Sequence, residues 1–187
     1  MAPVLRFPPL SHVRLFLVSA LLAGSGPSSL PAQAQAPRWF LDEVTGATAG
    51  TGRWIADNRA YTGPEEPADE YGLEWRQGPG GVSMTGRLFG LRGGSEIATY
   101  WQFLVYWHPA RQVAVILQVS ASGVVGEGTI REREGGTVAE QVFHSPDGGS
   151  RRIRHESEVS ASERRDRSSD WVDGAWKAGR SYTWRRS

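Results

Sequence analysis

The sequence predicts an all-β fold: a single up-and-down antiparallel β-barrel of about ten strands, with a short N-terminal helix after a cleaved signal peptide. Three observations support this prediction. Strand-like segments recur at the regular spacing typical of sandwiches and barrels. The breaks between them are rich in Gly, with Pro and Asp in several. Beyond one short segment, no stretch shows sustained apolar spacing of three and four residues.

The first 34 residues have the features of a secretory signal peptide. Arg6 and Arg14 supply positive charge, Leu15–Ala23 is a short apolar core, and an Ala-Gln-Ala-Gln-Ala sequence follows. Cleavage after Ala34 is favoured, because the second site would leave proline as the first mature residue. An uncleaved anchor is the alternative, but the apolar core is shorter than the roughly 20 residues of a membrane span. We expect an exported protein, periplasmic or extracellular, with residues 35–187 forming one barrel domain without a transmembrane span.

The composition excludes several classes of protein. The chain has no cysteine, so it is not a thiol enzyme, a zinc-thiolate protein or an acylated lipoprotein, and an exported domain must be stable through packing alone. Of its 21 basic residues, Arg6 and Arg14 lie in the signal peptide, so 19 remain against 20 acidic residues. This balance argues against nucleic acid as a partner, since phosphate binding needs a net basic face.

The strand-like segments are separated by turns whose residues accept positive φ, such as Gly93-Gly94 and Asp173-Gly174. Such short turns suit antiparallel neighbours and leave no room for crossover helices. The ten expected strands are Arg53–Arg59, Tyr71–Gln77, Val82–Arg92, Glu96–His108, Gln112–Ser120, Val124–Glu134, Thr137–His144, Arg151–Ser160, Arg164–Val172 and Ala175–Arg186.

Two segments break the strand pattern. Pro37–Val44 is expected to form one or two helical turns, with proline near its start. Tyr61–Asp69 is the longest break and is acidic and proline-containing. It is interpreted either as the rim of a cavity mouth or as a solvated connection between two strands.

The two ends of the expected barrel carry complementary side chains. Trp54 lies in the first strand, and Arg185 and Arg186 lie at the end of the last. A closed sheet must bring its first and last strands together, and a guanidinium stacks well on an indole. We therefore expect Trp54 to pack against Arg185 or Arg186 at the seam.

The segment Glu96–His108 is aromatic on both faces, whereas a half-solvated strand alternates apolar and polar residues. One face therefore lines a pocket, or the strand contributes to a packed core and an outer patch. Small barrels are either filled by side chains or hold one ligand. For the pocket, the candidate wall residues are Trp75, Tyr100, Trp101, Tyr106 and Trp107.

Polar residues at expected inward positions are candidate anchors for a ligand's polar group. In Arg151–Ser160, His155 alternates with apolar residues while the opposite set is charged. Arg131 lies on a similar mixed face of an earlier strand. Buried polar groups are costly unless they are hydrogen-bonded, so these residues either orient a ligand or satisfy one another.

No motif of catalysis, metal binding or cofactor binding is present, and neither a metal nor a cofactor is expected. The histidines lack H-x-H and H-E-x-x-H spacing, and there is no G-x-S-x-G elbow. An enzyme remains an alternative, with His155 and either Glu127 or Glu140 as an acid–base pair.

The sequence Gly52-Arg53-Trp54, together with the terminal arginines, resembles the signature of the calycin superfamily, which includes lipocalins and fatty-acid-binding proteins. Arg180-Ser181-Tyr182 is similar to the Arg-x-Tyr that holds the carboxylate in fatty-acid-binding proteins. The chain also resembles an uncharacterised group of exported bacterial lipocalin-like proteins. The resemblance implies a lipocalin-like barrel that binds a small apolar or amphipathic molecule. A filled barrel that interacts through an outer aromatic patch is the other alternative.

Overall fold

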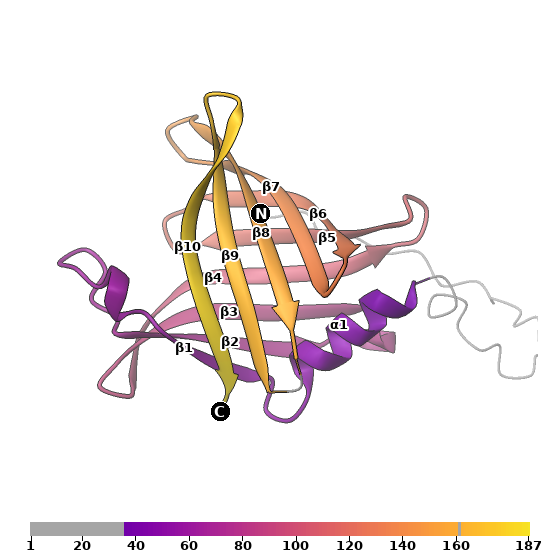
Figure 1. Ribbon diagram of the computed structural model, residues 1–187, viewed down its shortest axis with the longest axis horizontal. Helices are drawn as coiled ribbons and strands as arrows, with labels where there is room; N and C mark the ends of the chain where they lie inside the picture. Colours follow the sequence, from indigo (N-terminus) through magenta and orange to yellow (C-terminus); the bar gives the residue numbers. More distant parts are fainter. Residues whose placement is uncertain (1–35, 161) are drawn as a thin grey trace, which may run out of the picture.

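The computed structural model describes residues 36–160 and 162–187. The signal peptide expected over 1–34 lies outside these residues. In the described part of the chain, one helix precedes ten strands, with short 3-10 turns η1 and η2 on either side of β2 (Figure 1). None of the helices in the described residues is long and apolar enough to cross a membrane. The elements are α1 (Arg38–Thr48), β1 (Arg53–Asp57), η1 (Arg59–Tyr61), β2 (Glu70–Gln77), η2 (Pro79–Gly81), β3 (Ser83–Arg92), β4 (Ser95–His108), β5 (Val113–Ser120), β6 (Val125–Arg133), β7 (Gly136–His144), β8 (Ser150–Val159), β9 (Glu163–Val172) and β10 (Ala175–Arg186).

The ten strands form one closed barrel in which each strand is antiparallel to its neighbours in the chain. The barrel closes where β1 pairs with β10, so all strands have two hydrogen-bonded partners. Closure removes the sheet edges that would otherwise pair with another chain. The predicted fold class is confirmed.

The seam between β1 and β10 is held by the predicted pair of side chains. Trp54 is opposite Arg186 in the register and is 1% exposed. The Arg186 guanidinium lies 4.1 Å from the centre of the indole ring and also donates hydrogen bonds to the carbonyls of Gly46 and Ala49. Arg185, the alternative partner, has a side chain that is 75% exposed. Arg186 is therefore the residue that stacks on Trp54.

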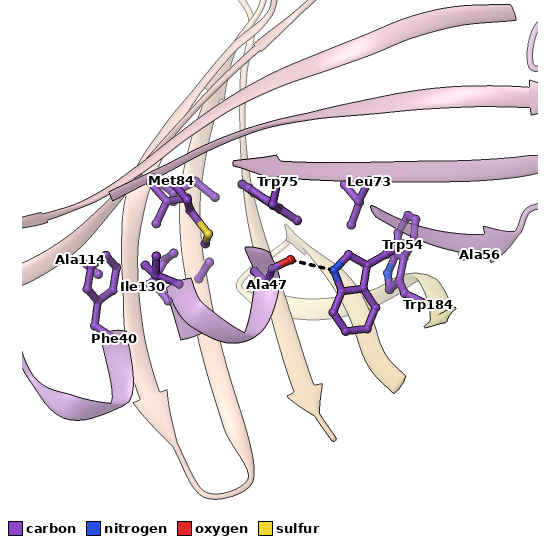
Figure 2. Close-up of a cluster of buried hydrophobic side chains, with 14 of the residues drawn as sticks. Phe40, Ala47, Trp54, Ala56, Leu73, Trp75, Met84, Ala114, Ile130 and Trp184 are labelled. Carbon is purple, nitrogen blue, oxygen red and sulfur yellow. Dashed lines mark hydrogen bonds between the residues drawn. The ribbon is translucent and has the colours of Figure 1, made fainter. Parts of the chain in front are cut away.

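The helix α1 lies across one end of the barrel (Figure 1). Phe40, Val44 and Ala47 are buried, at the i, i+4 and i+7 spacing of one helix face. At the C-terminal end of α1, the Trp54 indole N–H donates to the Ala47 carbonyl at 3.0 Å (Figure 2). The helix therefore extends past Val44, the last residue expected to be helical, because its final turn is fixed to the barrel.

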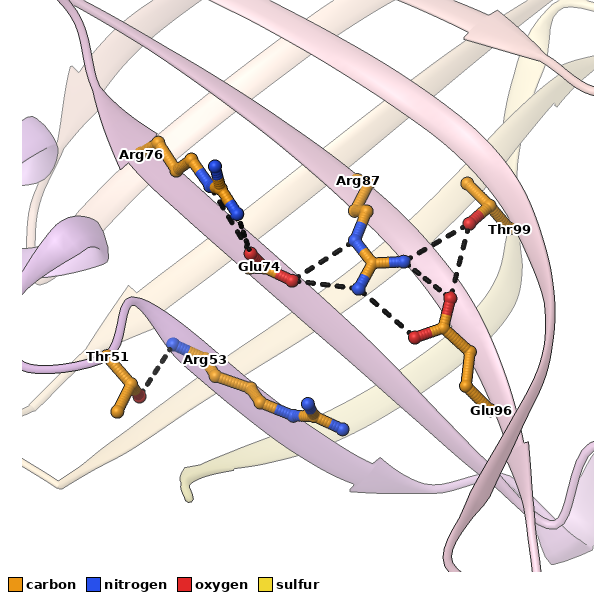
Figure 3. A network of polar contacts seen from close by, with 7 residues as sticks. All are labelled: Thr51, Arg53, Glu74, Arg76, Arg87, Glu96 and Thr99. Atoms are coloured by element: carbon orange, nitrogen blue, oxygen red, sulfur yellow. Dashed lines mark hydrogen bonds and ion pairs between the residues drawn. The ribbon is translucent and has the colours of Figure 1, made fainter.

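The outer face of β2–β4 carries a charged network (Figure 3). Arg87 binds Glu74 on β2 and Glu96 on β4, with nitrogen–oxygen distances of 2.9 and 2.5 Å. The same guanidinium lies 4.4 Å from the centre of the Phe89 ring, which is fully buried. That ring lies over Gly72, where a Cβ atom would collide with it. The Phe89 ring, on the outer face of the barrel, is thus buried between Gly72 and the guanidinium groups of Arg53 and Arg87.

Candidate functional site

A cavity of about 460 Å³ lies inside the barrel. It extends from Glu43 on α1 to the turns at the opposite end, where Val124 and Ser145 border it. This volume is in the range of small-molecule sites, which are usually concave, mostly apolar and supplied with a few polar groups. The inner residues of the barrel divide into an apolar wall and a polar wall.

The apolar wall comes from β2–β5. Trp75 on β2 stacks on Phe103 of β4, with ring centres 5.2 Å apart. Trp101, two residues before Phe103 in β4, packs edge to face with Phe143 on β7, with ring centres 5.6 Å apart. These rings offer a broad apolar surface to a ligand. The wall residues on β2–β5 are Leu73, Trp75, Met84, Leu88, Trp101, Phe103, Val105 and Ile116.

The polar wall is centred on Arg164 of β9. Its guanidinium donates to Asp166 at 2.9 Å, to Glu43 of α1 at 2.8 Å and to Ser157 of β8 at 2.8 Å. Burial opposes the charge of Arg164, but the two carboxylates outweigh burial and raise the pKa of the guanidinium. Arg164 therefore stays positively charged, and its charge is balanced by one carboxylate on α1 and one on the barrel.

His155 on β8 faces the same cavity. Its ring lies 6.4 Å from that of Phe143, and its Nε2 atom is buried without a hydrogen-bond partner in the described residues. Burial lowers the pKa of the imidazole more than the nearby Asp166 raises it. His155 is thus a neutral imidazole near neutral pH, with one nitrogen available to a ligand.

Two amide side chains meet inside the barrel by crossing β6. Gln118 Nε2 on β5 donates to Gln141 Oε1 on β7 at 2.8 Å. The intervening strand presents Gly126 and Gly128 at these positions of the register. A Cβ atom at Gly128 would lie 2.7 Å from Cγ of Gln141. The glycines make room for the amide pair, and Gln141 is 1% exposed with its Nε2 unpartnered among the described residues.

The loop that contains η1 lies at the barrel end opposite α1 and contacts β10. Glu66 of this loop accepts two hydrogen bonds from Arg180 of β10, at 2.5 and 2.6 Å, and further bonds from Tyr71 and Asn58. The Arg180 contact lowers the pKa of Glu66 to about 2. Tyr182 donates to the Asn58 side chain at 2.9 Å. Arg180 therefore does hold a carboxylate, but one that belongs to the chain itself, whereas Tyr182 binds the Asn58 amide.

Among the residues predicted to contact a ligand, Trp75, Trp101 and His155 line the cavity. Trp107 is buried beneath α1 instead, with its ring 5.9 Å from that of Phe40. It belongs to the packed end of the barrel rather than to the cavity wall.

The other three predicted residues lie elsewhere. In β4, a β-bulge leaves Tyr100 without a partner on β3, while the next residue, Trp101, pairs with Leu88. Both aromatic side chains therefore turn inward. The ring of Tyr100 packs against that of Tyr71, with ring centres 5.6 Å apart. Tyr100 thus adjoins the loop end without lining the cavity. Tyr106 alternates with the inward residues of β4 and lies on the outer face. Arg131 also lies outside, 64% exposed and paired with Glu140.

The acid–base pairs considered from the sequence are not formed. Glu127 and Glu140 alternate with the inward residues of β6 and β7, so they lie outside while His155 lies inside. Within residues 36–160 and 162–187, no cluster of three or more His, Asp or Glu side chains could hold a metal.

Sequence reasoning missed the polar groups that dominate the cavity. For Gln141 a signal existed: Ala139 and Phe143 flank it on the same face of an otherwise apolar alternation. For Arg164 there was none, because both alternating sets of residues on β9 are polar.

In comparisons with known proteins, no protein-family model matches the chain and no curated protein matches it.

Proposed function

We propose that the protein binds a small, largely apolar molecule with a polar group inside its barrel. The observation that carries this proposal is the cavity itself, with aromatic side chains on β2 and β4 facing hydrogen-bonding side chains on β7–β9. A barrel that acted only through its outer surface would need no such interior. The closed antiparallel topology supports assigning the protein to the calycin-like carriers that the seam residues suggested.

Titration with the apolar fluorophore N-phenyl-1-naphthylamine tests the proposal. We expect saturable fluorescence enhancement and quenching of the tryptophans that line the cavity. Ala139→Trp, on the inner face of β7, places an indole in the cavity and is expected to weaken binding by at least about tenfold, the effect of roughly 1.4 kcal/mol.

Val142→Trp is the matched control, since it introduces the same side chain on the outer face of the same strand. It should leave the affinity for the fluorophore unchanged. Equal affinity of the parent and both variants, each with an unchanged far-UV spectrum, would place binding outside the barrel and end the proposal.

We also propose that the chain is exported, on the basis of the charged, apolar and A-x-A segments before residue 35. Intact-mass measurement of the protein recovered from a secreting bacterial host should give a chain that begins at Gln35. Recovery of the full-length chain from the cytoplasmic fraction would contradict export.

A further inference from the structure

We propose that the cavity selects a neutral ligand whose polar group is a hydrogen-bond acceptor, such as a ketone, ester, lactone or amide carbonyl, and rejects carboxylates and amines. This inference rests on the proposed function, because it assigns the chemical class of the molecule that the cavity would bind.

Four residues of the cavity lining have a buried polar atom without a partner in the described residues, and in three of them that atom is a donor; the fourth atom, His155 Nε2, donates or accepts according to the tautomer of the ring. The indole Nε1 atoms of Trp75 and Trp184 and the amide Nε2 of Gln141 are buried without a partner in the described residues, and all three residues line the cavity. An indole N–H donates only, and so does an amide NH₂. Buried polar groups in folded proteins are normally paired, so these donors favour a ligand that brings acceptors.

The amide of Gln141 is the best-defined of these donors. Its Oε1 is already occupied by the Gln118 side chain at 2.8 Å, so the free hydrogen-bonding group is Nε2. The side chain is held in place over Gly128, where a Cβ would lie 2.7 Å from its Cγ. The amide is therefore pre-positioned, which reduces the ordering cost of binding.

Apart from Arg167, the charges that border the cavity are already compensated by the chain. Arg167 is exposed, and its neighbours on β9, Asp166 and Ser168, are the residues that turn inward. The three other arginines of the lining are bonded to carboxylates. These pairs are Arg151 with Asp170, Arg164 with Asp166 and Glu43, and Arg180 with Glu66.

A charged ligand would therefore be desolvated without a free counter-ion, or would have to break an existing pair. Desolvating a charge without a partner is unfavourable, and breaking the buried pairs of Arg164 would leave Glu43 and Asp166 uncompensated. A neutral carbonyl meets the unpartnered donors without disturbing any ion pair. The geometry thus favours neutral acceptors over both acids and amines.

Four naphthalenes of nearly equal size test this inference by calorimetry at pH 7. They are 2-acetylnaphthalene, 2-naphthoate, 2-(aminomethyl)naphthalene and 2-ethylnaphthalene. We expect the ketone to bind about tenfold more tightly than the other three, the effect of one buried hydrogen bond at the upper end of its usual range. Tighter binding of the acid or the amine, or equal binding of the ketone and the hydrocarbon, would overturn the inference.

The variant Gln141→Leu assigns the preference to the amide. It should bind the ketone and the hydrocarbon alike while keeping the parent's affinity for the hydrocarbon. Gln102→Leu, an exposed position of β4, is the control and should keep the ketone preference. If Gln141→Leu folds and still prefers the ketone, the assignment is wrong.

A second measurement needs no variant of Gln141. In the parent, the side-chain amide resonances of Gln141 should shift when the ketone is added and stay in place when the hydrocarbon is added; unchanged resonances with bound ketone would reject the subsite. Binding of N-phenyl-1-naphthylamine without any ketone preference would refute the inference alone. Failure of this fluorophore and of all four naphthalenes to bind would refute the proposed function together with it.

Discussion

The two ends of the barrel are stabilised by different interactions. At one end, α1 presents Phe40, Val44 and Ala47 to the core, where they are buried. The loop containing η1 lies at the other end (Figure 1). Glu66 of this loop has Arg180 as its main partner. The helix end depends mainly on apolar burial, and the loop end on a hydrogen-bond network around Glu66 and Asn58 that includes a partly exposed ion pair.

This difference predicts which end can open. Apolar burial does not depend on pH or salt, and α1 is also bound through Trp54, Arg164 and Arg186. A partly exposed ion pair contributes little and is screened by salt. We therefore expect the helix end to be a fixed part of the fold and the loop end to be where a ligand enters.

Trp54→Ala should have the largest effect, because it removes a buried indole from the fixed end. The substitution creates a cavity and removes the hydrogen bond to Ala47 and the stacking surface of Arg186. Large-to-small substitutions of buried tryptophan cost about 3–5 kcal/mol. Urea denaturation should show a loss of this size in the free energy of unfolding.

Trp171→Ala is the control for that measurement. Trp171 is 41% exposed, in the β9–β10 hairpin, where it meets the edge of Trp176 at 5.1 Å. Its loss should cost about 1 kcal/mol or less, since exposed aromatic pairs contribute about that much. Equal losses from the two substitutions would mean that Trp54 does not secure the fixed end.

The sequence predicted the fold well because the relevant signals are local. Gly-rich turns and alternating residues identified the ten strands, and the complementary Trp54 and Arg186 identified the seam. The bulge at Tyr100 could not be predicted, because no glycine or break in hydrophobicity marks it. One extra residue there turns Thr99 to the outer face, where it contacts Arg87, before a second irregularity at Ile97 shifts the register again.

The cavity was harder to predict than the fold, since it depends on which polar residues face inward. His155 was recognisable because apolar residues share its face. Arg131 was predicted to face inward because it shares one face of β6 with the apolar residue Val125. The inner face is instead the one that carries Gly126 and Gly128, and the side chains of Phe143 and Gln141 pack over these glycines. Glycines that leave room for neighbouring side chains carry no hydrophobic signal.

Arg164→Met tests the polar link between α1 and the barrel, at the fixed end. The substitution leaves Glu43 and Asp166 buried near each other without their shared cation. Breaking a buried ion pair by removing one partner costs about 3–5 kcal/mol, and we expect the lower part of this range because Ser157 remains nearby.

The triple variant Arg164→Met, Glu43→Gln, Asp166→Asn should recover most of the stability, because it removes the uncompensated carboxylates. A single variant as stable as the parent at pH 7 would show that Arg164 does not support the helix end.

Among the substitutions of the two ends, Glu66→Gln should have the smallest effect on the free energy of unfolding. It should have the largest effect on local opening of the loop end, as measured by hydrogen exchange. Folding lowers the pKa of Glu66 from its ordinary value of 4.5 to about 2. Its contribution is therefore complete above pH 4.5 and is lost as pH falls towards 2. Because the side chain of Arg180 is partly exposed, we expect a contribution of about 1 kcal/mol at pH 7, or about 2–4 °C in the melting temperature.

His155 also has a lowered pKa and adds to acid sensitivity in both proteins, so the difference between parent and Glu66→Gln isolates Glu66. That difference should disappear between pH 4.5 and 2 and shrink in high salt. Hydrogen exchange at the Asp69 amide, which donates to Leu91, should accelerate in the variant, while the backbone amides of α1 should exchange as in the parent. Faster exchange at both ends would mean that the barrel loosens as one unit, and the loop end would then not be a separate entrance.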